Sequence, residues 1–204
     1  MRGPKLGPVD PVAALVAVAA GLVAYYFRDE IEAAAEGAQS VATSTDWTGD
    51  GKWRNPNPAY RAGHIGMRNN NPGNIKEVGE NWQGMVPRAL RNEDGRTFVQ
   101  FSTMPWGIRA AYRVLRTYRD RHGLNTVRKI VNRWAPPGPE QSQTVVTNYM
   151  NAVARAAGVG PDDVLPDTPA KNRAVLTAKF AFENGGQMPS ASDLAEGFEL
   201  AGIG

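Results

Sequence analysis

The chain contains no cysteine. This absence excludes disulfide bridges, thiol nucleophiles and thiolate zinc sites, and it leaves the redox compartment undecided. Histidine is scarce: His64 and His122 do not lie at a spacing typical of metal ligands, and no Ser/His/Asp arrangement stands out. We therefore expect no metal, no cofactor and no covalent nucleophile.

A strong excess of one charge is also lacking, because 23 basic residues face 20 acidic ones and the net charge is +3. This balance is too weak to indicate nucleic acid by itself. The basic residues nevertheless concentrate between Arg109 and Arg133, where Asp120 is the only acid. We interpret this stretch as a solvated helix face. The alternative is a track for an anionic polymer, either DNA or the peptide carboxylates of peptidoglycan.

Long hydrophobic runs are rare, and one stands out at residues 11–27 (PVAALVAVAAGLVAYYF). As a helix it would reach roughly 25 Å, the short end of a bilayer span. Arg2 and Lys5 precede it and several acids follow it, so the positive-inside rule places the N-terminus inside. We predict a single-pass membrane anchor. A cleaved signal peptide and a buried alanine-rich helix are the alternatives.

The pattern predicts four parts: a basic N-terminal segment at 1–10, the transmembrane helix at 11–27, a polar linker at 28–62 and one domain at 63–204. The last part has the usual size of a single domain. It is expected to be mainly α, a small α+β domain with one short strand at 97–101. Apolar spacing and capping residues predict helices at 105–122, 125–134, 142–157, 169–186 and 192–201.

The segment 66–76 (GMRNNNPGNIK) carries four asparagines, two glycines and a proline, and NWQG follows at 81–84. Such a turned loop offers carboxamide donors and acceptors that suit an uncharged polar ligand such as a sugar, and Trp82 could stack on a sugar face. The alternative is that the asparagines satisfy their own turns and Trp82 belongs to the core.

Glu183 lies at the end of a predicted amphipathic helix, just before a Gly-Gly turn. The negative end of the helix dipole and partial burial would both raise its pKa. A protonated carboxylic acid can protonate the leaving oxygen of a glycosidic bond. The alternative is an ordinary exposed glutamate. Glu140, in the loop after Pro137, is a weaker candidate for the acid.

Five motifs, in order, resemble a family of bacteriophage virion structural proteins with suspected lysozyme-like activity. They are RNNNPGNI (68–75), WQG (82–84), FVQF (98–101), GIRA (107–110) with GLNT (123–126), and RWAPP (133–137). The resemblance covers about residues 66–202 and implies a lysozyme-like domain in a virion protein.

A second resemblance is to bacterial glucosaminidases and goose-type lysozyme relatives, including lytic transglycosylases. They place a catalytic glutamate at a helix end, shortly before an Asn-rich turn and a Trp-x-Gly. Here both halves exist in the opposite order, which a circular permutation would explain. This resemblance implies that Glu183 is catalytic and lies within roughly 10 Å of the Asn-rich loop. The residues expected to bind substrate are Asn69, Asn71, Asn74, Trp82, Arg109 and Trp134.

Together these features predict a membrane-anchored virion protein that cleaves peptidoglycan glycan strands during phage entry or exit. Its anchor would lie in the virion membrane or the host inner membrane, with the domain outside or in the periplasm. The alternative is a non-enzymatic virion component whose lysozyme-like domain binds cell wall, capsid or DNA. The expected partners are peptidoglycan, a membrane and other virion proteins.

Overall fold

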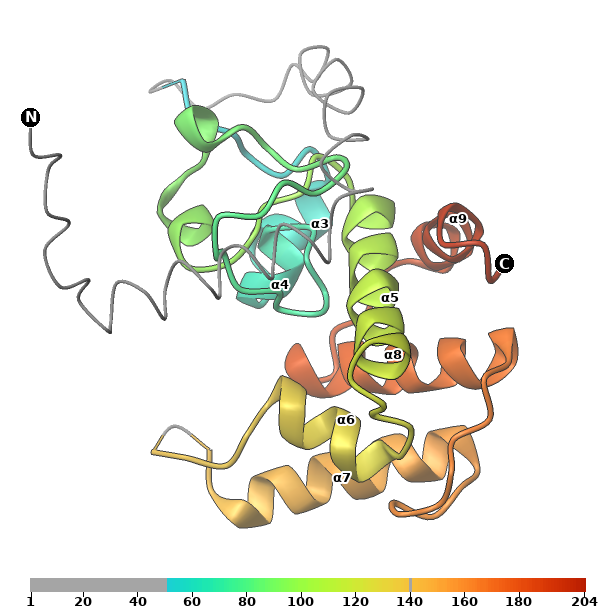
Figure 1. Ribbon diagram of the computed structural model, residues 1–204. Helices are drawn as coiled ribbons and strands as arrows, with labels where there is room; N and C mark the ends of the chain where they lie inside the picture. The colour runs from blue at the N-terminus through green and yellow to red at the C-terminus, as the bar shows by residue number, and fades with distance from the viewer. Residues whose placement is uncertain (1–50, 140) are drawn as a thin grey trace, which may run out of the picture.

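The computed structural model describes residues 51–139 and 141–204 (Figure 1). The predicted anchor at 11–27 and most of the predicted linker lie outside the described residues. Within the described part of the chain, no helix has both the length and the apolar character needed to cross a membrane.

Helices dominate the described residues. Two short helices come first, α3 (Pro58–Arg61) and α4 (Ile65–Arg68), and a loop-rich stretch with two 3-10 turns follows. The longer helices then follow in chain order: α5 (Met104–Asp120), α6 (Val127–Trp134), α7 (Gln143–Ala157), α8 (Pro169–Glu183) and α9 (Ala191–Leu200). Their positions confirm the predicted helices to within a few residues.

Local capping explains where these helices begin and end. The side chains of Thr126, Ser142 and Thr168 each accept a hydrogen bond from the main chain of the first turn of α6, α7 and α8, respectively. Such caps satisfy amide groups that the helix itself leaves unpaired. At the other end of α7, Gly158 adopts a left-handed conformation with a φ of 62°, which glycine tolerates without a Cβ penalty.

Helix α5 joins two halves of the fold (Figure 1). It packs against α9 along one side, while α7 packs against both α6 and α8. Leu115, Val146 and Phe180 are fully buried and belong to one continuous hydrophobic cluster. The end of α8 is thereby held at the junction between the helical half and the loop-rich half.

The strand predicted at 97–101 is wrong, and with it the small α+β class. Among the described residues this segment makes only isolated bridges, Phe98 with Lys76 and Phe101 with Met85. Side-chain amides add to the main-chain hydrogen bonds that this segment makes with Ile75 and Val86. Asn71 Nδ2 donates to the Val99 carbonyl at 2.9 Å, and Asn70 Nδ2 donates to the Phe101 carbonyl at 3.2 Å. The described part of the fold is therefore mainly α.

Part of the predicted linker packs onto this core. Trp53 is fully buried and Tyr60 nearly so. The Tyr60 hydroxyl donates to Asp193 Oδ2 at 2.6 Å and accepts from the Ser190 amide at 2.7 Å. These bonds connect the start of the described chain to the first turn of α9, so packed structure begins upstream of residue 63.

Candidate active site

Glu183 is the last residue of α8, and its side chain is only 14% exposed. Three donors surround the carboxylate. Lys179 Nζ and the Tyr149 hydroxyl donate to Oε1 at 2.9 and 3.1 Å, and Asn74 Nδ2 donates to Oε2 at 3.1 Å. The predicted closeness of Glu183 to the Asn-rich loop is therefore confirmed, although more than 100 residues separate them in sequence.

The position of Glu183 follows from local sequence. Helix α8 ends because Asn184 and Gly185 follow it, and Gly185 takes a left-handed φ of 58°. Asn184 is fully buried, and its Nδ2 donates to the Pro72 carbonyl at 2.9 Å. This bond fixes the helix end directly against the Asn-rich loop.

The predicted rise in the pKa of Glu183 is wrong. Burial does favour the neutral acid, but the Lys179 charge and the hydrogen bonds from Lys179, Asn74 and Tyr149 outweigh it and lower the pKa of Glu183. The prediction counted burial and the helix dipole, and it omitted the lysine one turn earlier on the same helix face. Glu183 is thus an ionised carboxylate at neutral pH.

Tyr149 and Lys179 complete the electrostatics around the carboxylate. Burial, followed by the charge of Glu183, raises the pKa of Tyr149 well above its usual value, so the phenol stays protonated and donates. Burial lowers the pKa of Lys179, and Glu183 opposes that change. The Tyr149 ring also stacks on Phe182, with centroids 4.1 Å apart, which holds the phenol in place.

The predicted substrate-binding asparagines separate into two groups. Asn69 and Asn71 are fully buried. Asn69 Oδ1 accepts from Gln100 Nε2 at 2.9 Å, and Asn71 bonds the main chain of Ile75 and Val99. These two residues build the loop, and their amides face the protein interior rather than a ligand.

Asn74 is partly exposed and is the asparagine that reaches Glu183. Its φ of 50° lies in the left-handed region, which asparagine adopts more readily than most other residues. A Cβ at Gly66 would lie 2.7 Å from Asn74 Oδ1 and would overlap Asn184 Oδ1. Glycine at position 66 therefore leaves room for both amides beside the helix end.

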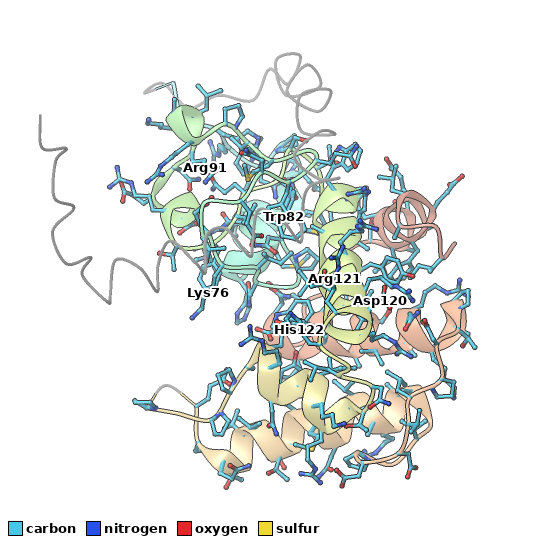
Figure 2. All side chains as sticks on the ribbon, viewed as in Figure 1. Lys76, Trp82, Arg91, Asp120, Arg121 and His122 are labelled. Atoms are coloured by element: carbon cyan, nitrogen blue, oxygen red, sulfur yellow. The ribbon has the colours of Figure 1, made fainter. Side chains whose placement is uncertain are left out.

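The remaining predicted binding residues lie in different environments. Trp82 is 2% exposed and lies inside the loop-rich half (Figure 2). Trp134 is partly buried; its Nε1 donates to the Gly73 carbonyl at 3.1 Å, and Lys179 Nζ lies 4.0 Å from its ring centroid. Arg109 is partly exposed on α5, with its guanidinium 6.0 Å from the Trp106 ring. Of these three, only Trp134 adjoins the Glu183 cluster.

Sequence reasoning missed Lys179, Tyr149 and Tyr118. Lys179 could have been found, because it stands four residues before Glu183 and the two side chains share a helix face. Tyr149 lies on another helix and carried no such signal. Tyr118 adjoins the site through Trp134, with ring centroids 5.5 Å apart.

Glu140 lies outside the described residues. Among the residues that are described, no group of three or more His, Cys, Asp or Glu side chains is arranged to hold a metal ion. The site that the structure offers is therefore a single, largely buried carboxylate with one ammonium, one phenol and one amide around it.

No protein-family model matches this chain. Over 137 residues it is 39% identical to protein P5 of Pseudoalteromonas phage PM2, a match that covers 66% of this chain and 79% of that protein. This identity, over 79% of P5, shows that the two proteins share a common ancestor along most of the length of P5. The chain therefore belongs to the family of protein P5 of phage PM2.

Proposed function

We propose that this chain is a virion-associated phage protein that cleaves the glycan strands of peptidoglycan, with Glu183 as the general acid and base. The family relationship to a phage protein supports the virion role. The observation that carries the catalytic role is the hydrogen bond between Asn74 and Glu183, which brings a helix-end glutamate onto an Asn-rich loop. The predicted anchor at 11–27 would hold the domain next to a membrane.

The chemistry requires Glu183 to take up a proton before it acts. An acid that protonates the glycosidic oxygen allows the C–O bond to break through an oxocarbenium-like state. No second carboxylate is clearly paired with Glu183 in the sequence. This favours a single-acid lytic transglycosylase, in which the 6-hydroxyl of the sugar completes the reaction, over a hydrolase with two carboxylates.

The groups that could hold a sugar beside Glu183 are the partly exposed ones. Asn74 offers an amide, and Trp134 and Tyr118 offer half-buried aromatic surface. Aromatic rings bind the apolar faces of sugars, and amides bind their hydroxyl and acetamido groups. Asn69, Asn71 and Trp82 act indirectly in this proposal, because they are buried and shape the loop.

A second candidate function is a non-enzymatic virion component whose domain binds cell wall, capsid or DNA. The ion pair between Lys179 and Glu183 on α8 favours it, because the two side chains are 4% and 14% exposed and Lys179 also donates to the Gly73 carbonyl of the loop-rich half. Removing one partner of such a pair is strongly destabilising. Glu183 would then be retained for the fold.

The test is clearing of purified peptidoglycan by the full chain in detergent, with variants designed around the ion pair. Glu183→Gln alone would leave Lys179 buried without a counter-charge, so Glu183→Gln/Lys179→Met is the better acid-free variant. Thermal denaturation establishes that it is folded. The exposed Glu196 of α9 provides the control, as Glu196→Gln.

We expect the wild type and Glu196→Gln to clear peptidoglycan and the folded double variant not to. Clearing by the double variant would place the acid elsewhere, with Glu140 the next residue to replace. A folded wild type that clears nothing at any pH from 3 to 8 would favour the non-enzymatic function.

A further inference from the structure

Lys179 is an unusual residue for the interior of this domain. It lies on α8 one turn before Glu183 and is 3% exposed. Its ammonium donates to Glu183 Oε1 at 2.9 Å and to the Gly73 carbonyl at 3.0 Å. The ring centroid of Trp134 lies 4.0 Å away, at cation–π distance.

These three contacts use all the N–H donors of the Lys179 ammonium. A lysine ammonium has three N–H donors and no acceptor, and here a carboxylate, a carbonyl and an aromatic face each receive one. No donor is left for a bound ligand, and the side chain is almost inaccessible to one. Lys179 therefore acts on Glu183 and on the loop, and it does not contact substrate.

Of the three side chains that donate to the Glu183 carboxylate, Lys179 is the positively charged one. From α7 the facing group is the protonated Tyr149 hydroxyl, and from the Asn-rich loop it is the neutral Asn74 amide. From α6, Trp134 faces Lys179 itself. The His64 ring lies beside Gly185, just beyond the end of α8. Burial opposes ionisation of Glu183, and the nearby charge that favours ionisation is that of Lys179.

We propose that Lys179 is a positioning residue that holds Glu183 deprotonated in the resting protein, so that glycan cleavage depends on proton uptake from acidic solvent. Solvent protonates Glu183 at its exposed edge, and Glu183 passes that proton to the glycosidic oxygen as the C–O bond breaks. The carboxylate then accepts the proton of the attacking hydroxyl, and Lys179 keeps its own proton throughout.

The activity part of this inference rests on the proposed function and is tested by a pH profile of peptidoglycan clearing. An opposite charge beside a carboxyl lowers its pKa by about 1–3 units. Lys179→Met keeps the unbranched stem of the side chain and removes the ammonium, so we expect the acidic midpoint of clearing to rise by about 1–3 pH units. Lys129→Met, on the exposed face of α6, should leave the midpoint unchanged. Clearing by folded Lys179→Met with the same acidic midpoint as the wild type would overturn the inference.

The effect of Lys179 on the charge of Glu183 can be measured by NMR titration, which does not depend on enzymatic activity. In the full chain labelled with ¹³C at glutamate carboxyls, the Glu183 signal is identified by its loss in Glu183→Asp and then titrated in the wild type. We expect its midpoint below the ordinary glutamate value of about 4.3. Tyr149→Phe, which removes one hydrogen bond, should raise it slightly, and Lys179→Met should raise it further.

A wild-type midpoint at or above the ordinary value would refute the role of Lys179, even if Lys179→Met did not fold. A low midpoint in a wild type that clears no peptidoglycan would instead refute the proposed function and leave the control of the Glu183 charge by Lys179 standing.

Discussion

Gly107→Ala tests a close approach of α5 to the Asn-rich loop. In the interior of a helix such as α5, replacing glycine by alanine normally stabilises by about 1 kcal/mol. Here an added Cβ would overlap the main-chain carbonyl oxygen of Asn70 and lie 2.9 Å from its carbonyl carbon and 3.1 Å from Pro72 Cδ. Main-chain atoms cannot rotate away as a flexible side chain can.

We therefore expect the sign of the effect to reverse. Overpacking of this kind costs about 1–3 kcal/mol and sometimes more, and relief would require the Asn-rich loop to move away from α5. Because the overlap is with main-chain atoms, we expect the upper end of this range, about 3 kcal/mol, and subtracting the propensity gain of about 1 kcal/mol leaves a net loss of about 2 kcal/mol. For a protein of this size, each kcal/mol corresponds to a fall in Tm of about 2–4 °C.

Urea denaturation of the full chain, followed by tryptophan fluorescence, measures the free energy of unfolding. Gly138→Ala is the matched control, because a Cβ there would meet nothing within 4 Å and the residue does not need a left-handed φ. We expect it to change the free energy of unfolding by less than about 0.5 kcal/mol. A Gly107→Ala variant as stable as the wild type, or more stable, would refute the close packing of α5 on the loop.

Three further predictions concern stability. Thr126→Ala removes the cap of α6 and should lower the free energy of unfolding in urea by about 1 kcal/mol; no change would show that the cap contributes nothing. Asn71→Ala removes buried hydrogen bonds to Ile75 and Val99 and should cost at least about 2 kcal/mol by the same assay, whereas a cost below that of Thr126→Ala would contradict the role of Asn71 in building the loop. The lowered pKa of Glu183 means that its charge stabilises the fold above the unfolded-state value of about 4.3 and that this contribution is lost as the pH falls through the folded pKa. The Tm advantage of wild type over Glu183→Gln should therefore shrink from pH 7 to pH 3, and a widening gap would contradict the ion pair.

The helices could be predicted because their signals are local. Thr126, Ser142 and Thr168 each stand where their hydroxyl meets the first turn of the helix that follows, and Gly158 stands where α7 ends. These features depend on neighbours a few residues away, so the sequence alone contains them.

The strand at 97–101 could not be predicted correctly, because its environment depends on residues about 30 positions upstream. Alternating apolar side chains suggest a strand, but the groups that bond this segment include the amides of Asn70 and Asn71. The same asparagines looked like a ligand-binding loop. Carboxamides serve a buried main chain and a sugar with the same donors and acceptors, and sequence does not show which of the two they face.

The ionisation of Glu183 was mispredicted for a related reason. A lysine one turn before a glutamate points toward it only if its ammonium also finds other partners there. For Lys179 these partners are the Gly73 carbonyl and the Trp134 ring. Both belong to segments far from α8 in sequence. The identity of the candidate acid could thus be predicted from its place at a helix end, while its charge required the three-dimensional contacts of Lys179.

Mass spectrometry of the material that the folded full chain releases from purified peptidoglycan tests the glycan-cleaving function most directly. We expect soluble muropeptides ending in anhydromuramic acid, as a single-acid transglycosylase would produce, with a yield that increases as the pH falls toward the pKa of Glu183. Release of no glycan fragments between pH 3 and pH 8 by protein shown to be folded would contradict this function.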